Sequence, residues 1–469
     1  MTCEVRARRR AGLLRGLAAA TCIAVLATPV PAHAAGSDLL TGVLAEPGGA
    51  GLGGGLRIER SMYRDAGTRN DLLPLYMYDG KHIYLHAYRF GLKLDRSETH
   101  RFDVFIEHRF EGFPYDKRPA SLAGMGDRES GLDAGVSYEL RGNWGAAYVE
   151  ALHNFSDASG GNEVRLGYRY DWKSGRLGLR PYAMLSWRDS SLNNYYYGVR
   201  PEEATALRPA YQPGAGVNAE LGLFGVYALS NRWRLLGGLS ATRWSKGVIG
   251  SPIVDGRVQP TAMIGLMYDF SPEDKPWPEE RPIFMRALYG KATECDVAKT
   301  MRLACTSTQT EDGTRIAGFE IGRSFVERLN GWPFDIAGYV GVMRHDERNV
   351  QADIWQLNAY MRGRWYGFPW SDRVMTRISM GAGISYAQAV PVLERRNQER
   401  SGRNTSQLLN YLDPTIDFSV GDVLGVQSLK KTFLGFGVSH RSGIFGTSQL
   451  LGNVNGGSNY IYSYLEWEM

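Results

Sequence analysis

Apolar and polar residues alternate along most of the chain. In the run 163–172, for example, Val164, Leu166, Tyr168, Tyr170 and Trp172 are separated by polar residues or glycine. Because successive side chains of a strand point to opposite faces, this pattern predicts strands with one apolar and one polar face. We expect ten to twelve strands before residue 271. Eight more are expected at 283–292, 314–328, 334–345, 353–367, 374–389, 407–419, 431–445 and 457–469.

The length of these runs indicates a membrane protein. Many of them cover 10 to 14 residues, which exceeds the usual globular strand and matches a tilted strand that crosses a membrane. The chain also holds 26 Tyr and 11 Trp, the residues that form aromatic girdles at membrane interfaces. We therefore expect an all-β fold of antiparallel transmembrane β-barrels. The alternative is a secreted β-sandwich or β-propeller, which fits less well with the strand length and with a final strand that reaches the C-terminus.

A proline-rich segment divides the strands into two groups. Residues 272–282 contain four prolines, which cannot lie inside a sheet because proline donates no ladder hydrogen bond. We expect two barrels in tandem, of about 10–12 strands in 35–271 and about eight strands in 283–469, joined by a linker at 272–282. One barrel of 18 to 20 strands is the alternative. The glycine-rich segment 48–55 is expected to be a flexible entry to the first barrel.

The N-terminal segment predicts export. Residues 1–34 combine arginines at 6–15, an apolar stretch at 17–27 and a small-x-small site, Ala32-His33-Ala34, typical of a signal peptide cleaved before Ala35. A membrane anchor is the alternative, but the apolar stretch is short for a bilayer. Two cysteines then remain, Cys295 and Cys305. In an oxidising compartment they favour a disulfide, and the alternative, a metal site, lacks other ligands nearby.

Charge and motifs exclude several function classes. Without residues 1–34 the chain holds 49 basic and 48 acidic residues, so no basic face for nucleic acid is expected. No zinc spacing, EF-hand or phosphate loop appears in the sequence. We therefore expect no cofactor and no metal.

Three short segments of the first half lie in an order that resembles the MipA/OmpV family of outer-membrane proteins. They are Asn194-Tyr195-Tyr196-Tyr197-Gly198-Val199, Tyr211-x-Pro213-Gly214-Ala215-Gly216 and Ser251-Pro252-Ile253-Val254. The resemblance covers residues 36–271 and implies an outer-membrane barrel with a scaffold role between murein enzymes, or a pore or adhesin role. It carries no catalytic residues. We interpret Tyr195–Tyr197 as part of an aromatic girdle.

Candidate chemistry lies near the C-terminus. Residues i and i+2 of a strand share a face, so His440 and Ser442 point the same way as the apolar residues Leu434, Phe436 and Val438. On the last strand, Asn459 shares the apolar face. Because the apolar face of a membrane barrel meets lipid, these three polar side chains are expected on the lipid side of the wall. Bacterial barrels carry long loops outside the cell, which places them near the outer leaflet and its lipopolysaccharide.

This arrangement resembles the lipid A 3-O-deacylases (PagL-like), eight-stranded barrels with a His-x-Ser motif on the penultimate strand. The resemblance implies that His440 is the general base and Ser442 the nucleophile. The family's Asn-Pro-Gly-x-Glu segment, whose Glu orients the histidine, is matched by Asn455-Gly456-Gly457-Ser458-Asn459, so Asn459 stands in the place of the acid. An asparagine can orient a histidine, as in Cys-His-Asn enzymes.

Two functions follow from these patterns. The first is hydrolysis of an ester-linked acyl chain on lipid A by Ser442, His440 and Asn459. The second is a non-catalytic envelope scaffold, pore or adhesin. The expected partners are lipopolysaccharide and murein-associated envelope proteins, and the expected location is the bacterial outer membrane.

Overall fold

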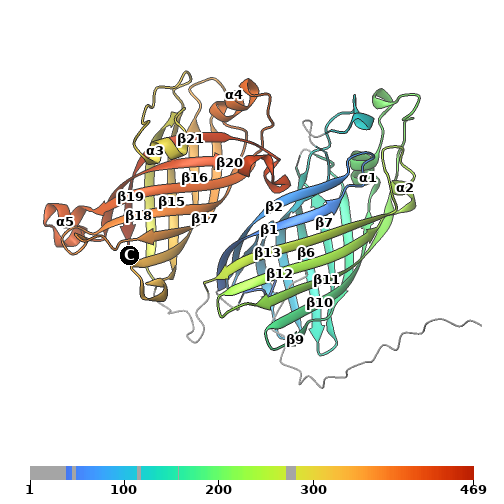
Figure 1. Ribbon diagram of the computed structural model, residues 1–469, viewed down its shortest axis with the longest axis horizontal. Helices are drawn as coiled ribbons and strands as arrows, with labels where there is room; N and C mark the ends of the chain where they lie inside the picture. Colours follow the sequence, from blue (N-terminus) through green and yellow to red (C-terminus); the bar gives the residue numbers. More distant parts are fainter. Residues whose placement is uncertain (1–37, 45–48, 114–117, 157, 271–280) are drawn as a thin grey trace, which may run out of the picture.

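The computed structural model describes residues 38–44, 49–113, 118–156, 158–270 and 281–469. They form two antiparallel β-barrels that lie side by side (Figure 1). The expected fold class, a larger barrel followed by an eight-stranded one, is therefore confirmed, and the single large barrel is excluded. The signal peptide expected at 1–34 and most of the linker expected at 272–282 lie outside the described residues.

The first barrel is a ring of twelve strands. Its strands are β1 (Gly49–Arg60), β2 (Thr68–Asp79), β3 (Ile83–His86), β4 (Arg89–Arg96), β5 (His100–Arg109), β6 (Gly131–Gly142), β7 (Gly145–Asn154), β8 (Asn162–Arg169), β10 (Leu177–Arg188), β11 (Gly216–Ala228), β12 (Trp233–Arg243) and β13 (Val258–Asp269). The ring closes where β13 pairs with β1. A short additional strand, β9 (Trp172–Ser174), pairs with the beginning of β10.

Strand β6 shows how the alternating sequence builds the wall. Val136, Tyr138 and Leu140 are exposed on the outer side, whereas Ser137 and Glu139 between them are buried in the lumen. The lumen holds a ladder of ion pairs, among them Arg169 with Glu139 at 2.7 Å and Arg109 with Glu163 at 2.7 Å. An apolar outer surface around a charged interior is the reverse of a soluble protein and typical of a membrane barrel.

The glycine-rich segment is part of the wall, so the prediction of a flexible entry at 48–55 is wrong. Residues 49–60 form β1, which pairs with β2 on one side and with β13 on the other. A Cβ atom added to Gly53 would lie 2.2 Å from the carbonyl oxygen of Leu266 on β13. The glycine therefore permits close approach of the two strands.

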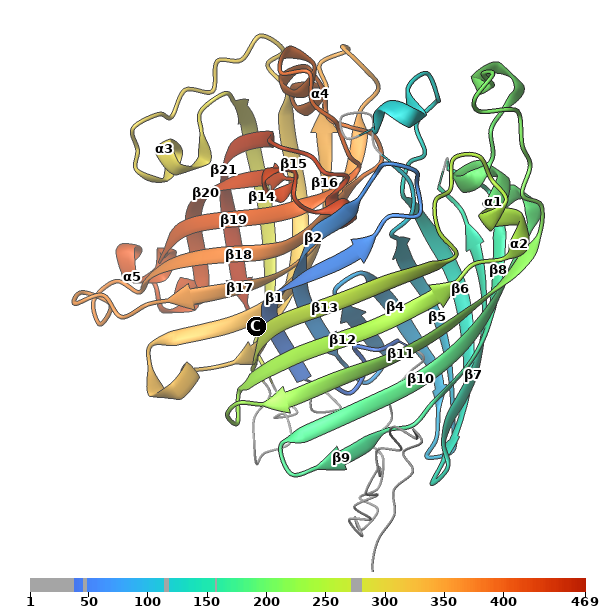
Figure 2. The ribbon, with the colours of Figure 1, turned by 45° about the vertical axis from the view of Figure 1, so that its right-hand side comes forward.

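The interpretation of Tyr195–Tyr197 as an aromatic girdle is also wrong. These residues end helix α1 (Ser190–Tyr197), and Tyr196 and Tyr197 are buried in an apolar cluster with Trp244 and Val248 at the long-loop end of the first barrel. Val248 belongs to the short helix α2 (Lys246–Ile249), which lies at the same end of the barrel as α1 (Figure 2). The tyrosines therefore face protein and not lipid.

The second barrel is a closed ring of eight strands, each paired with its neighbours in the sequence. They are β14 (Ile283–Thr293), β15 (Arg315–Val326), β16 (Phe334–Asp346), β17 (Ile354–Trp365), β18 (Thr376–Ala387), β19 (Leu408–Ser419), β20 (Thr432–Ser442) and β21 (Gly457–Glu468). Helices α3 (Val297–Met301) and α4 (Val392–Arg400) lie in loops at one end, and α5 (Val420–Leu424) lies at the other (Figure 1).

Side chains fill the second barrel. The Arg286 guanidinium is completely buried, with Nε 2.7 Å from Glu320 Oε2 and Nη2 3.0 Å from Asp413 Oδ2. Stacked tyrosines, including Tyr339 and Tyr360, occupy the space around it. An eight-stranded barrel has an interior just wide enough for side chains, so this lumen is a packed core.

Among the described residues, no helix combines the length and the apolar character that a bilayer crossing needs.

Candidate functional site

The predicted site residues lie at the long-loop end of the second barrel. His440 and Ser442 are at the end of β20, and Asn459 is near the beginning of β21. The register of the two strands places His440 directly opposite Asn459 and Ser442 opposite Gly457. The hairpin of β20 and β21 thus places the three residues within two ladder steps of one another.

All three side chains lie on the outer side of the wall. Arg441, between His440 and Ser442, points into the lumen, where its Nη1 donates to Gln356 Oε1 at 3.4 Å. Tyr460, next to Asn459, also points inward and contacts His345. Because neighbouring residues of a strand point to opposite faces, His440, Ser442 and Asn459 face outward.

His440 and Asn459 are in hydrogen-bond contact. The Nδ1 atom of His440 lies 2.5 Å from Oδ1 of Asn459, and Nδ2 of Asn459 donates to the backbone carbonyl of Cys295 at 2.9 Å. A carbonyl oxygen can only accept, so the contact with Cys295 determines which end of the Asn459 amide is the nitrogen. The amide oxygen then faces His440 and requires a proton on Nδ1. The Nε2 atom is left unprotonated in the neutral ring, which is the form that a general base needs.

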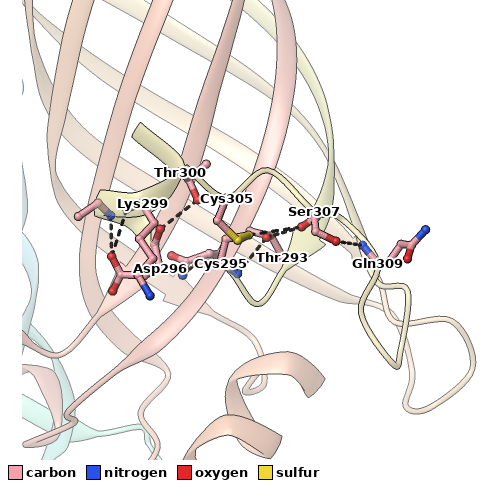
Figure 3. Close-up of a disulfide and its surroundings, with 10 residues drawn as sticks. Thr293, Cys295, Asp296, Lys299, Thr300, Cys305, Ser307 and Gln309 are labelled. Atoms are coloured by element: carbon pink, nitrogen blue, oxygen red, sulfur yellow. Dashed lines mark hydrogen bonds between the residues drawn. A yellow bond between two sulfur atoms is a disulfide. The ribbon is translucent and has the colours of Figure 1, made fainter. Parts of the chain in front are cut away.

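A disulfide-closed loop supplies the Cys295 carbonyl. The sulfur atoms of Cys295 and Cys305 are bonded, with their Cα atoms 5.7 Å apart, and α3 lies between them in the sequence. Thr293 at the end of β14 fixes the base of the loop, since its Oγ1 donates to the Ser307 carbonyl at 2.6 Å (Figure 3). The loop therefore presents a backbone acceptor at a defined place beside β21.

The same loop covers part of the outer face of β20. Helix α3 packs against β20, and Val438, two residues before His440, is only 5% exposed although it points outward. His440 is partly buried for the same reason. The disulfide-closed loop therefore covers part of the outer face at the site. Ser442, two residues after His440, remains partly exposed.

Ser442 is near the pair but is not joined to it. Within the described residues its hydroxyl makes no hydrogen bond with His440, and catalytic hydrogen bonds of this kind often form only when substrate is bound. Gly457, opposite Ser442, leaves room beside the hydroxyl. A Cβ atom there would lie 1.7 Å from the Arg441 carbonyl oxygen, so the position requires glycine.

Two site groups escaped the sequence analysis. One is the Cys295 carbonyl. It is a backbone atom 164 residues from Asn459, so the sequence contains no pattern that indicates the contact. The other is Asn410 on β19, the strand that pairs with the edge of β20 away from β21. Asn410 is the register partner of Ser442 in that pair. A signal for Asn410 does exist: it is a polar residue on a strand face that otherwise carries Leu412, Ile416 and Phe418.

A metal centre finds no support in this part of the barrel. The residues that the structure describes contain no group of three or more His, Cys, Asp or Glu side chains that could hold a metal ion.

The three segments that resemble the MipA/OmpV family come together in the first barrel. The Ser251 hydroxyl donates to the Tyr197 carbonyl at 2.6 Å, and the backbone of Val199 pairs with Tyr211. Ile253 and Val254 complete the apolar cluster around Tyr196. The segments thus form one structural unit at the long-loop end.

Known proteins resemble the first barrel. The family model "MltA-interacting protein MipA" matches residues 52–270. Outer membrane protein OmpV of Vibrio cholerae serotype O1 is 31% identical over 160 residues, which are 34% of this chain and 62% of OmpV. MltA-interacting protein of Escherichia coli K12 is 26% identical over 231 residues, 49% of this chain and 93% of that protein. The chain therefore spans less than two thirds of the length of OmpV.

Solved structures add little to this result. LpxR from Salmonella typhimurium has a TM-score of 0.18 and 9% identity, over 65% of this chain and 88% of that chain. The family match ends at residue 270, so the likeness of residues 283–469 to PagL-like deacylases stays a prediction. Residues 52–270 form a barrel that is similar to the MipA/OmpV proteins, and the protein is a β-barrel protein of the bacterial outer membrane.

Proposed function

We propose that the second barrel hydrolyses an ester-linked acyl chain of lipid A, with Ser442 as nucleophile, His440 as general base and Asn459 as the residue that orients His440. One observation carries the proposal: the Asn459 amide bridges His440 Nδ1 and the Cys295 carbonyl, at 2.5 Å and 2.9 Å. An asparagine with only a packing role on a membrane-facing surface would not need both contacts.

The proposed reaction has two halves. In the first, the Ser442 oxygen bonds to the ester carbonyl carbon while its proton passes to His440 Nε2, and the carbon–oxygen bond to the sugar breaks as that proton moves to the leaving oxygen. In the second, water attacks the acyl-serine with His440 again as base, which releases the fatty acid and restores Ser442. The Asn459 oxygen keeps Nδ1 protonated and the ring in place in both halves.

Location supports lipid A as the substrate. The long loops of outer-membrane barrels face outside the cell, and the loops 294–314, 388–407 and 443–456 lie at the end of the barrel that holds the site. His440 and Ser442 face the membrane side of the wall near this end. The lipid of the outer leaflet is lipopolysaccharide, whose ester-linked acyl chains would reach Ser442 from the side.

Mass spectrometry of lipid A tests the proposal. The protein is expressed in a bacterial host without lipid A deacylases, next to the Ser442→Ala variant. Wild type should remove one hydroxyacyl mass from lipid A, and Ser442→Ala should not. Identical spectra for the two, at equal amounts of folded protein in the outer membrane, would contradict the proposal.

A second function concerns the first barrel. The resemblance of residues 52–270 to a protein named for its interaction with MltA suggests that this barrel binds a murein enzyme of that kind. Co-purification of MltA with a variant that carries Ser442→Ala would support a scaffold role that is independent of hydrolysis. Equal recovery of MltA with an unrelated outer-membrane barrel would contradict it.

A further inference from the structure

The outer face of the second barrel carries a polar side chain beside Ser442 that the proposed mechanism has not used. Asn410 on β19 is the register partner of Ser442. Directly opposite side chains on one face of an antiparallel pair have Cβ atoms roughly 5 Å apart. Asn410 is 5% exposed. The amide of Asn410 is therefore a buried polar group next to the proposed nucleophile.

The first barrel orients this amide. The hydroxyl of Tyr76 on β2 donates to Asn410 Oδ1 at 2.6 Å. The oxygen end of the amide is thus engaged, and the nitrogen end, which carries two N–H donors, has no hydrogen-bond partner among the residues that the structure describes. This nitrogen is not among the fully buried side-chain atoms that lack a partner, so its N–H groups remain accessible to a bound molecule.

Tyr76 can reach the second barrel because one edge of β2 is open. The short strand β3 pairs only with Met77–Asp79 of β2. Earlier on the same strand, where β3 no longer pairs with β2, the N–H of Leu72 donates to the Thr447 carbonyl of the second barrel at 2.9 Å. Pro74, next along this edge, has no N–H to donate, as expected for an edge strand. The loop 443–456 therefore occupies the place that a longer β3 would take.

Side chains extend this backbone contact into a packed seam. Arg69 Nη1 donates to Gln449 Oε1 at 2.6 Å. Leu73 and Leu75 of β2 share one buried apolar cluster with Leu450 and Leu451 of the loop. Both views show the loop beside β2 (Figures 1 and 2). The seam holds the loop that begins directly after Ser442.

The loop also begins with a strained backbone. Ile444 and Phe445 have φ angles of 46° and 58°, in the left-handed region that residues with large side chains avoid. Strain of this kind persists only where the surroundings determine the conformation. The contact of Thr447 with Leu72 of β2, two residues after Phe445, holds the loop in this conformation.

We infer that Asn410 is a further catalytic residue, whose amide N–H stabilises the oxyanion formed when Ser442 attacks, and that Tyr76 of the first barrel is its positioning residue. This inference rests on the proposed function. As the Ser442 oxygen bonds to the carbonyl carbon, the carbonyl oxygen gains negative charge and needs a donor already in place. The two barrels then form one site, with the first barrel setting the orientation of a group in the second.

Variants at the two positions test the inference in the full-length protein. Asn410→Asp keeps an oxygen for Tyr76 but removes the N–H donor, and should lower kcat for ester hydrolysis by about 10²-fold, with KM nearly unchanged. Tyr76→Phe removes only the hydroxyl and should lower kcat by a smaller factor, again with little change in KM. The matched control is Tyr78→Phe, on the same strand, whose ring stacks on Phe325 at 5.2 Å and should keep wild-type kcat.

A cross-link reports the seam without reference to activity. After residue 34 the sequence holds only Cys295 and Cys305, which are bonded to each other. Leu72 and Thr447 are joined across the seam by a backbone hydrogen bond of 2.9 Å, a separation that a disulfide can span, so the double variant Leu72→Cys, Thr447→Cys should form one new disulfide in the membrane, seen by mass spectrometry of the digested protein. Absence of this disulfide would overturn the seam on which the positioning role of Tyr76 depends.

The outcomes separate the inference from the proposed function. A wild-type protein that neither hydrolyses esters nor reacts with a fluorophosphonate at Ser442 would overturn both, whatever the cross-link shows. An active wild type with an equally active Asn410→Asp variant would overturn the inference and leave the proposed function standing. Loss of kcat in Asn410→Asp and Tyr76→Phe, but not in Tyr78→Phe, supports the inference.

Discussion

Asn459 donates its side-chain N–H to the backbone carbonyl of Cys295 at 2.9 Å. The contact joins the last strand to the loop after the first strand of the same barrel, and it turns the amide oxygen of Asn459 toward His440. The tautomer of His440 in this structure thus follows from a backbone atom in the disulfide loop.

Replacement of Asn459 by leucine should disable the proposed base. Leucine has a similar size but neither accepts from His440 nor donates to Cys295, so the imidazole loses its fixed tautomer. We expect kcat for ester hydrolysis to fall by about 10²-fold or more, measured on detergent-solubilised protein. Ser463→Ala, on the exposed outer face of the same strand, is the control and should keep wild-type kcat. Equal rates for Asn459→Leu and wild type would contradict an orienting role.

Removal of the disulfide should loosen the loop that holds Asn459. In a Cys295→Ala, Cys305→Ala double variant the backbone carbonyl of residue 295 remains, but no disulfide closes the loop. Loss of a disulfide destabilises the structure that it closes by typically 2–4 kcal/mol. We therefore expect faster protease cleavage within 294–314, together with a lower kcat. Unchanged cleavage and unchanged kcat would show that the loop needs no disulfide to present its carbonyl.

Arg286 should be essential for the stability of the second barrel. In an Arg286→Met variant, the carboxylates of Glu320 and Asp413 remain buried without their partner. Such a loss typically costs about 3–5 kcal/mol, and urea unfolding in micelles should show it. The control is Arg344→Met, which breaks an exposed ion pair with Asp353 and should cost about 1 kcal/mol or less. Equal losses for both variants would contradict a packed, paired lumen.

Two adjacent glycines of β1 should respond differently to alanine. A Cβ atom on Gly53 would lie 2.2 Å from the Leu266 carbonyl oxygen, whereas one on Gly54 would meet nothing within 4 Å. Gly53→Ala should therefore destabilise the first barrel by about 1–3 kcal/mol, and Gly54→Ala should be neutral or slightly stabilising. The measurement is thermal unfolding in micelles followed by circular dichroism. A reversed order would contradict the register of β1 and β13.

Glu347 should make the loop end of the second barrel sensitive to pH. Burial raises the pKa of its carboxyl to about 7, while its Oε2 accepts from the Val392 N–H at the start of α4. A carboxyl with a raised pKa favours the folded state at low pH, and this stability is lost as pH rises from about 4.5 to about 7. Glu347→Gln keeps an acceptor for Val392 and removes the titration.

The Glu347→Gln variant should match wild type at pH 4 and exceed its stability at pH 8 by up to about 3 kcal/mol, because each unit of pKa shift corresponds to 1.36 kcal/mol. Thermal unfolding at both pH values provides the comparison. Glu399→Gln, on the exposed side of α4, should show no pH-dependent difference. A difference between Glu347→Gln and wild type that is the same at both pH values would contradict the raised pKa.

The sequence by itself determined the strands that alternate and the side of the wall to which their residues point. The run 163–172 contains β8, whose Val164, Leu166 and Tyr168 are exposed as expected, and the outward orientation of His440 and Ser442 follows from the same period of two. This information is local, because the geometry of a single strand sets it. The prediction from local patterns was wrong where a segment shows no alternation of apolar and polar side chains. The glycines of β1 have no side chains to alternate, and the buried tyrosines of α1 lie on a helix.

Only the tertiary structure decided which groups meet at the site. Asn459 meets Cys295 because β21 closes the ring on β14, and Asn410 meets Tyr76 because the open edge of β2 accepts the loop 443–456. These contacts join residues 164 and 334 positions apart. Their formation depends on barrel closure and on the packing of one barrel against the other, which no repeat in the amino-acid pattern encodes.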